Sequence, residues 1–213
     1  MKNMRRLLTV LSFAWIIPGT QAETVFDNLT GASLAFFGPG CCQIGDEIVL
    51  GGTAREVTRL KFGVSTQGVD LVAVIEMAIY ANDGPGGSPG TLLWRSGPLT
   101  GLPVPANATE IAVEVPSIAV PDVITVTSIL AAAPIALGRL EPTPPAIGSF
   151  DRAWIENAPG VWGRGFGFAV QVDAVPEPPS NVLMITALLG GLVLASTRAG
   201  RTKSAVHTRV TSP

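Results

Sequence analysis

Histidine is almost absent from this 213-residue sequence, and the single one is His207. Hydrolytic triads, thiol–imidazole pairs and most zinc sites need a histidine. Because His207 follows the last long apolar run of the chain, such sites are excluded from the main body. No glycine-rich string that would suit a nucleotide follows a predicted strand. We therefore expect a protein that is not an enzyme and that has no cofactor and no metal.

Acidic side chains offer two weaker alternatives. Asp46 and Glu47 form the obvious pair for glycoside hydrolysis, but neighbours on a strand point to opposite faces and cannot flank one bond. Asp70, Asn82 and Asp83 could supply oxygen ligands to calcium, yet they lack the alternating spacing of a calcium-binding loop. A solvated hairpin is the interpretation that we favour for these residues.

Cysteine is scarce too, and the two cysteines, Cys41 and Cys42, are adjacent. Adjacent Cα atoms lie about 3.8 Å apart, below the roughly 4.4–6.8 Å of an ordinary disulfide, so a bridge between them would be strained. Three states remain open: a strained vicinal disulfide that stiffens the loop, two free thiols, or a bridge to another chain. The Cys-x-x-Cys spacing of a redox enzyme is absent.

Charged residues make up only 14% of the chain, and their distribution is more informative than the net charge of -2. All 16 acidic residues lie between residues 23 and 179, where only seven basic residues occur, so this body has a net charge of -9. Such a body would repel the phosphates of DNA or RNA. We therefore expect no nucleic-acid partner.

The N-terminus has the three parts of a secretory signal peptide. Basic residues precede an apolar run at residues 7–17, and small residues end the segment at Ala22. As a helix, this apolar run would span only about 16 Å, well short of a hydrocarbon core of about 30 Å. We predict that residues 1–22 are a signal peptide, cleaved between Ala22 and Glu23.

Residues 182–197 form a second apolar segment, which carries no charge. As a helix they would span roughly 24 Å, which is short for a membrane but sufficient if the flanking polar side chains reach the interfaces. Basic residues follow the segment and acidic residues precede it. The positive-inside rule therefore places residues 204–213 in the cytoplasm and the body outside, the topology that the signal peptide also predicts.

A Val-Pro-Glu-Pro box stands before this apolar segment and basic residues follow it: Val175, Pro176, Glu177 and Pro178, then Arg198, Arg201 and Lys203. Successive prolines keep the box extended and remove amide donors, so it cannot join a sheet or a helix. The box, a Leu- and Gly-rich apolar helix and a basic end, in this order over residues 174–203, resemble the PEP-CTERM sorting signal.

The resemblance implies a setting and a partner. The partner would be an exosortase-type processing enzyme in the inner membrane of a Gram-negative bacterium. The protein would reach the cell envelope or surface, or be secreted after sorting. Bacteria with such signals usually make exopolysaccharide, so the resemblance also implies a link with exopolysaccharide and biofilm.

Alternation of apolar and polar residues predicts β-strands throughout residues 23–173. Within residues 165–173, the inward face would carry Phe166, Phe168, Val170 and Val172. Similar alternation marks residues 58–64 and 71–80. Shorter strands are expected at 47–50, 91–96, 110–115, 123–129 and 153–156. No stretch of this region has a long helical spacing.

Roughly eight short strands separated by Gly and Pro turns predict an all-β protein, with an antiparallel β-sandwich ectodomain, jelly-roll-like, at residues 23–173. A single C-terminal transmembrane helix at 182–197 would follow. The stretch at 80–94, with a loop of turn formers at 82–90, is similar to a loop that recurs in jelly-roll ectodomains of secreted bacterial proteins. This similarity supports the fold and indicates no ligand.

Large aromatic side chains are few, and Trp94, Trp154 and Trp162 all fall in the predicted ectodomain. Together with Tyr80 they could form a stacking platform for sugar rings. Burial in the core is the alternative that we favour. The sequence therefore predicts an exported, non-catalytic cell-surface or extracellular-matrix protein. The second hypothesis is a carbohydrate-binding module for exopolysaccharide, which two or more exposed tryptophans on one face would favour.

Overall fold

The computed structural model describes residues 21–33, 35–36, 42–66, 68–130 and 137–177 of the chain. Strands dominate this part of the chain, and the only helical element within it is a 3₁₀ turn, η1 (Pro85–Gly87). The predicted all-β class is therefore confirmed. Each of the expected strand regions overlaps an observed strand.

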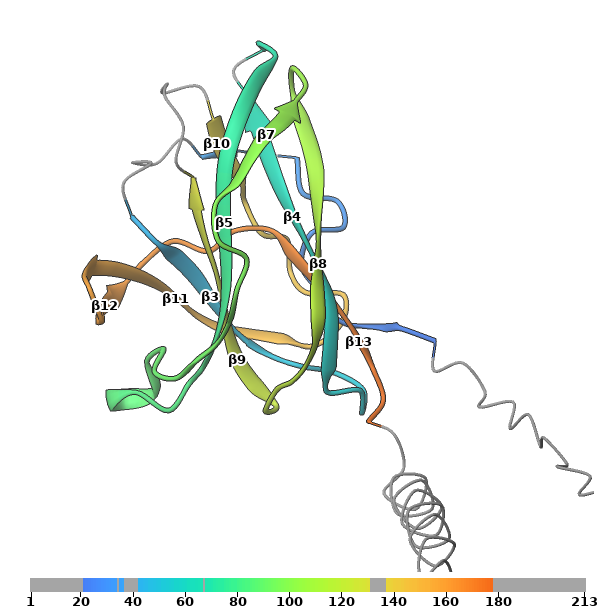
Figure 1. Ribbon diagram of the computed structural model, residues 1–213, viewed down its shortest axis with the longest axis vertical. Helices are drawn as coiled ribbons and strands as arrows, with labels where there is room; N and C mark the ends of the chain where they lie inside the picture. Colours follow the sequence, from blue (N-terminus) through green and yellow to red (C-terminus); the bar gives the residue numbers. More distant parts are fainter. Residues whose placement is uncertain (1–20, 34, 37–41, 67, 131–136, 178–213) are drawn as a thin grey trace, which may run out of the picture. The chain divides into compact units, whose positions relative to one another are not determined.

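Two antiparallel sheets make up the described residues (Figure 1). In the first, sheet A, β4 has β8 along one edge, and β13 followed by β10 along the other. β1 pairs with β13, and β2 pairs with β10. The strands of sheet A are β1 (Glu23–Asp27), β2 (Ala35–Phe36), β4 (Glu56–Thr66), β8 (Ala108–Ala119), β10 (Leu137–Leu140) and β13 (Val170–Val175).

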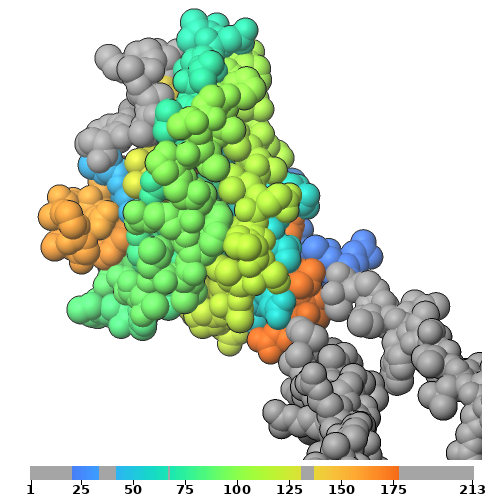
Figure 2. Space-filling model, viewed as in Figure 1, coloured from blue at the N-terminus to red at the C-terminus, as the bar shows by residue number. Residues whose placement is uncertain are grey.

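Sheet B has the strand order β12-β11-β3-β9-β5-β6, and β7 also pairs with β5. β11 and β12 form a hairpin that projects from the body (Figure 2). The strands of sheet B are β3 (Ile44–Val49), β5 (Leu71–Ala81), β6 (Leu92–Arg95), β7 (Leu99–Val104), β9 (Val123–Leu130), β11 (Ser149–Ala158) and β12 (Val161–Arg164).

One hydrophobic core joins the two sheets, because its buried side chains come from strands of both. Successive side chains of a strand point to opposite faces, so each sheet has an inner face towards this core and an outer face. The predicted alternation is confirmed in 60–64 and 71–80. At the start of β4 the register shifts between Val57 and Arg59, so Val57 enters the core and Thr58 is only half-buried. Fully buried core residues of β4 and β5 are Val57, Leu60, Phe62, Val64, Ala73, Ile75, Met77 and Ile79.

The strand predicted at 165–173 is wrong in its first part. β13 begins only at Val170, and Phe166 is 67% exposed although Phe168 is fully buried. The amide of Phe168 donates to the Asp46 carboxylate at 3.2 Å, and the amide of Val170 donates to Asn28 Oδ1 at 2.6 Å. The side chains of Asp46 and Asn28 thus accept hydrogen bonds that a neighbouring strand would otherwise accept. Regular strand pairing starts only at Val170, and the alternation does not extend back to Phe166.

Buried polar side chains also connect the sheets. Asp46 of β3 is fully buried, and its carboxylate accepts from Phe168 N and from Asn28 Nδ2, both next to strands of sheet A. Arg139 of β10 donates from Nε to Ser128 Oγ and from Nη2 to Ser128 O in β9, each at 2.9 Å. Burial lowers the pKa of Arg139 to about 10. Hydrogen bonds therefore fix the position of one sheet on the other where apolar packing alone would not.

The chain divides into two units, Met1–Pro176 and Glu177–Pro213. All the described strands belong to the first unit, and Glu177 is the one described residue of the second. The predicted membrane segment at 182–197, the predicted tail at 204–213 and residues 1–20 of the predicted signal peptide lie outside the described residues. Within the described part of the chain, no helix is long and apolar enough to cross a membrane.

Candidate functional site

The described residues of the predicted export and sorting signals lie at one end of sheet A, where the start of β1 pairs with the end of β13. Ala22 precedes β1, which begins at Glu23. Val175, which the sequence places in the sorting box, is the last residue of β13 and pairs with Glu56. Pro176 and Glu177 follow, outside any strand and exposed. The part of the box that an enzyme could reach therefore starts at Pro176.

Several other predicted residues lie outside the described part of the chain, namely Pro178, Arg198, Arg201, Lys203 and Cys41. Cys42 is described and half-buried. The three states weighed for the Cys41–Cys42 pair therefore stay predictions.

The three tryptophans of the predicted sugar platform do not lie together. Trp94 pairs with Ile79 of the core and packs against the same core from the inner face of sheet B. Trp154 pairs with Gly45, and Trp162 pairs with Glu156 on the same side of the β11–β12 hairpin. Two of the three thus share the outer face of sheet B, and Trp94 does not belong to that face.

Polar and aromatic side chains surround these two tryptophans on the outer face of sheet B. We call them the outer-face cluster, which comprises Gln43, Glu47, Glu76, Tyr80, Arg95, Arg152, Trp154 and Trp162. Their strands are adjacent in the order β12-β11-β3-β9-β5-β6, although the residues lie far apart in the sequence. Threonine side chains of β9 underlie the cluster and are fully buried, namely Thr125 and Thr127.

Tyr80 is the centre of one half of the cluster. Its hydroxyl accepts hydrogen bonds from Gln43 Nε2 at 3.1 Å and from Arg95 Nη2 at 2.9 Å. The Tyr80 and Trp162 rings form an edge-to-face contact, with 5.6 Å between centroids and 71° between planes. Arg95 Nη1 also lies 3.1 Å from Glu76 Oε1, an oxygen that accepts no well-aligned hydrogen bond from the described residues.

Glu47 is the centre of the other half. Its Oε2 accepts from Trp154 Nε1 at 3.0 Å and lies 3.3 Å from Arg152 Nε. The Arg152 guanidinium stacks over the Trp154 ring at 5.6 Å from the centroid and also contacts Asp151 at 2.8 Å. Trp154 is only 9% exposed, so its ring is covered by Arg152 and its neighbours.

The charges of the cluster balance one another. Burial raises the pKa of Glu47, although the Trp154 hydrogen bond and the Arg152 charge oppose the effect. The hydrogen bond to the Tyr80 hydroxyl raises the pKa of Arg95, and Glu76 adds to it. Each of these guanidinium groups therefore has a carboxylate beside it, and the cluster offers paired donors and acceptors.

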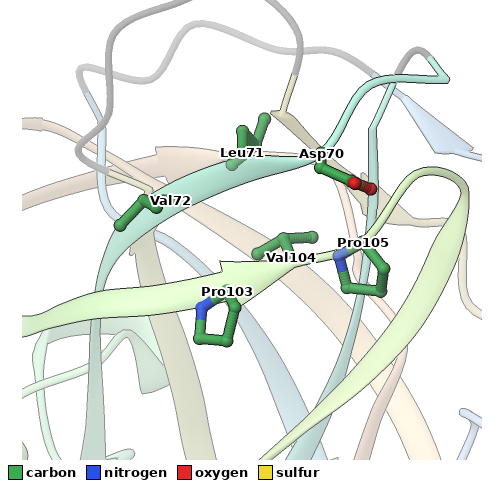
Figure 3. Close-up of a pocket in the computed structure, with 6 residues that line it drawn as sticks. All are labelled: Asp70, Leu71, Val72, Pro103, Val104 and Pro105. Carbon is green, nitrogen blue, oxygen red and sulfur yellow. The ribbon is translucent and has the colours of Figure 1, made fainter.

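A groove of about 450 Å³ is lined by the start of β5 and the end of β7 and shares no residue with the cluster (Figure 3). Its lining is apolar except for Asp70, whose carboxylate accepts from the Ala106 amide at 2.6 Å. A single carboxylate that already binds a backbone amide is not sufficient for acid–base chemistry. The lining residues are Asp70, Leu71, Val72, Pro103, Val104 and Pro105.

The acidic side chains considered for hydrolysis or for calcium binding do not come together in the structure. Asp46 points into the core and Glu47 points to the outer face, as expected for neighbours on one strand. Asp70 and Asp83 lie at opposite ends of β5, so they cannot share a calcium ion. Among the described residues, no group of three or more His, Cys, Asp or Glu side chains could hold a metal ion.

Comparisons of the chain with protein-family models, with curated proteins and with solved structures find no match. The site must therefore be interpreted from its own residues. The sequence indicated Tyr80 and the tryptophans, but not Gln43, Glu76, Arg95 or Arg152. The alternation in residues 71–80 already placed Glu76 and Tyr80 on the same face, which is the one signal that could have linked two members.

Proposed function

We propose that this chain is an exported, non-catalytic cell-surface or extracellular-matrix protein that is sorted by an exosortase-type enzyme. The proposal depends on the order of three parts at the C-terminal end. These are the Val-Pro-Glu-Pro box at 175–178, the uncharged apolar segment at 182–197, and the basic residues Arg198, Arg201 and Lys203.

Two features of sheet A support the proposal. β1 begins at Glu23, so cleavage after Ala22 would leave every described strand intact. β13 ends at Val175, and the exposed Pro176 and Glu177 come directly after it. A processing enzyme could therefore bind the box from Pro176 onwards without unfolding the sheet.

The proposal includes a finer fold and a location. The ectodomain is a jelly-roll-like sandwich, in which the first strand lies beside the last and early and late strands mix in each sheet. Residues 182–197 cross the inner membrane as one helix, and residues 204–213 remain in the cytoplasm. After sorting, the ectodomain serves as a structural or adhesive module in the cell envelope, on the surface or in the secreted matrix.

The test replaces Pro176, Glu177 and Pro178 together by alanine in a host with its exosortase. One tag follows Ala22 and another stands at the C-terminus. We expect most wild-type protein to have lost the C-terminal tag, because the resemblance implies processing near the box. The triple variant should stay full-length in the inner membrane, since the apolar segment is unchanged, and immunoblots of both tags measure the difference.

The matched control replaces Glu141, Pro142 and Pro144 by alanine, which removes the same residue types from an exposed loop of the body. It should be processed like the wild type. Equal retention of the C-terminal tag by wild type and triple variant would show that the box is only a linker.

A second candidate function is carbohydrate binding, the alternative raised by the aromatic residues. The observation that favours it is the outer-face cluster, where the half-buried Trp162 lies beside Tyr80 and Arg95. Trp154 shares this face but is buried under Arg152, so the face does not carry the two exposed tryptophans that would favour sugar binding most. A glycan array probed with the full-length protein in mild detergent tests it. Binding to no glycan would contradict carbohydrate binding, and the structural role would be the one candidate left.

A further inference from the structure

We propose that the Tyr80–Trp162 half of the outer-face cluster is the binding site, and that its ligand is a neutral polysaccharide. The inference rests on the second candidate function, carbohydrate binding, and adds the place of the site and the chemical class of the ligand. Three observations carry it: a tyrosine hydroxyl held by two donors, a half-buried tryptophan ring beside it and a balanced charge.

The hydroxyl belongs to Tyr80. A phenolic hydroxyl accepts two hydrogen bonds and donates one. Gln43 and Arg95 fill both acceptor positions of the Tyr80 oxygen. Both hydrogen bonds recorded at this oxygen among the described residues are ones that Tyr80 accepts. The Tyr80 hydroxyl is therefore held in place by two donors. Tyr80 is only 8% exposed, so it positions Trp162 and Arg95 and offers a ligand no more than its accessible edge.

The half-buried ring belongs to Trp162. In an edge-to-face pair, Tyr80 covers one face of Trp162 at most, and part of Trp162 remains accessible. A free tryptophan face suits the apolar face of a sugar ring. Trp154 does not offer such a face, because Arg152 lies over its ring and little of it is exposed. Of the three predicted stacking residues, only Trp162 therefore meets the requirement.

The balance of charge selects the class of polysaccharide. Arg95 lies against Glu76, and Arg152 lies against Glu47 and Asp151, so neither guanidinium is available to a carboxylate of the ligand. The body around them has a net charge of -9 and would repel an anionic polymer. Ion pairs beside an aromatic ring can instead donate to and accept from neutral hydroxyl groups.

The test measures retention of full-length protein, in mild detergent, on insoluble neutral polysaccharides (cellulose, mannan and starch) and on an acidic one (calcium alginate). We expect retention on at least one neutral polymer, with little change when salt is raised. Trp162→Ala should weaken it about tenfold, as loss of a stacking contact predicts. Tyr80→Phe, which removes only the hydroxyl, should also weaken it.

Val72→Ala is the matched control, because Val72 is exposed on the same sheet but lines the groove between β5 and β7. It should bind as the wild type does. Thermal unfolding followed by circular dichroism checks that each variant is folded, and Trp162→Phe should recover part of the binding.

Each result has a distinct meaning. Stronger retention on alginate than on the neutral polymers would overturn the ligand class, while carbohydrate binding itself would stand. Unchanged binding by folded Trp162→Ala and Tyr80→Phe, or loss in Val72→Ala alone, would overturn the site. Retention on no polymer would overturn carbohydrate binding and this inference together, and would leave the sorting proposal to its own experiment.

Discussion

At the scale of single residues, two buried carboxylates respond to pH in opposite directions. Burial raises the pKa of Asp46 well above its usual value, against the hydrogen bonds from Phe168 and Asn28. Burial also raises the pKa of Asp173, but hydrogen bonds from Gln171, Arg59 and Thr24 outweigh it, and the net pKa is lowered. Asp173 therefore stabilises the fold above its unfolded pKa, and this stability is lost as the pH falls.

Asp46 leads to a prediction in which folding stability changes with pH in the opposite direction. Its contribution to stability is complete below its unfolded pKa of about 3.9 and is lost as the pH rises towards the folded pKa. Asp46→Asn keeps an acceptor for the Phe168 amide but cannot ionise. We expect the stability of the variant, relative to wild type, to increase from pH 4 to pH 7, by up to about 1.4 kcal/mol per pH unit.

Urea unfolding of the full-length protein at several pH values measures this difference. Asp122→Asn is the control, because the Asp122 carboxylate is exposed at the surface. A stability difference between Asp46→Asn and wild type that is the same at every pH would show that the buried carboxylate does not carry the pH dependence.

At the scale of elements, β8 is the strand most open to unwanted pairing. It is 12 residues long and, among the described strands, it pairs only with β4. Its exposed side carries Glu110 and Glu114, and Pro116 with the positive φ of Ser117 interrupts its register. Charges, proline and bulges are the usual protection of an edge strand.

The glutamates of β8 allow a test of that protection. If two copies paired through β8 around Ala112, Glu110 of one would face Glu114 of the other, twice in each dimer. Replacing both by threonine removes the repulsion and raises β-propensity, so we expect self-association to strengthen about tenfold. Sedimentation of the full-length protein in detergent measures it.

The control for this variant is the pair Asp122→Thr and Glu141→Thr, which changes the net charge equally at exposed positions outside β8. It should associate no more than wild type. Equal association by both double variants would attribute the effect to net charge and not to the strand edge.

The strands that the sequence predicted are those with clear alternation, such as β4, β5 and β9. β10 was not predicted, because a pattern of apolar residues gives no reason to bury Arg139 in a core. β7 and β12 were not predicted either, because β7 contains Pro103 and β12 has only four residues with a glycine among them. These strands depend on tertiary partners, and propensity alone does not indicate them.

The candidate site shows the same limit. The aromatic residues were visible in the sequence, but their common face depends on the pairing of β5 with β9, β9 with β3 and β3 with β11. These strands are separated by long stretches of sequence, so their register is set by the whole core and not by local pattern. For the same reason, the sequence could not separate Trp94 from the other two tryptophans.

At the scale of the whole molecule, the start of β1 leads to a prediction about the mature protein. Glu23 pairs with Ala174, and its carboxylate accepts from the Ala54 amide at 3.1 Å. Cleavage after Ala22 would keep these contacts, so N-terminal sequencing of envelope material should give Glu-Thr-Val-Phe. Material that starts at Met1 would contradict the predicted signal peptide. Signal peptidase needs a small residue before the cleavage site, so the Ala22→Arg variant should accumulate as a longer chain.

The position of β13 between β1 and β4 has a mechanical consequence. Tension applied to the chain at Pro176 enters the body through Val175, and its component along β13 loads that strand lengthwise. Hydrogen bonds to neighbours on both edges, from Glu23 to Asp27 and from Glu56 to Phe62, share that load in shear. Bonds loaded together in shear resist force better than bonds opened one after another, so this end of the body is suited to bear a pull from whatever holds the C-terminal segment.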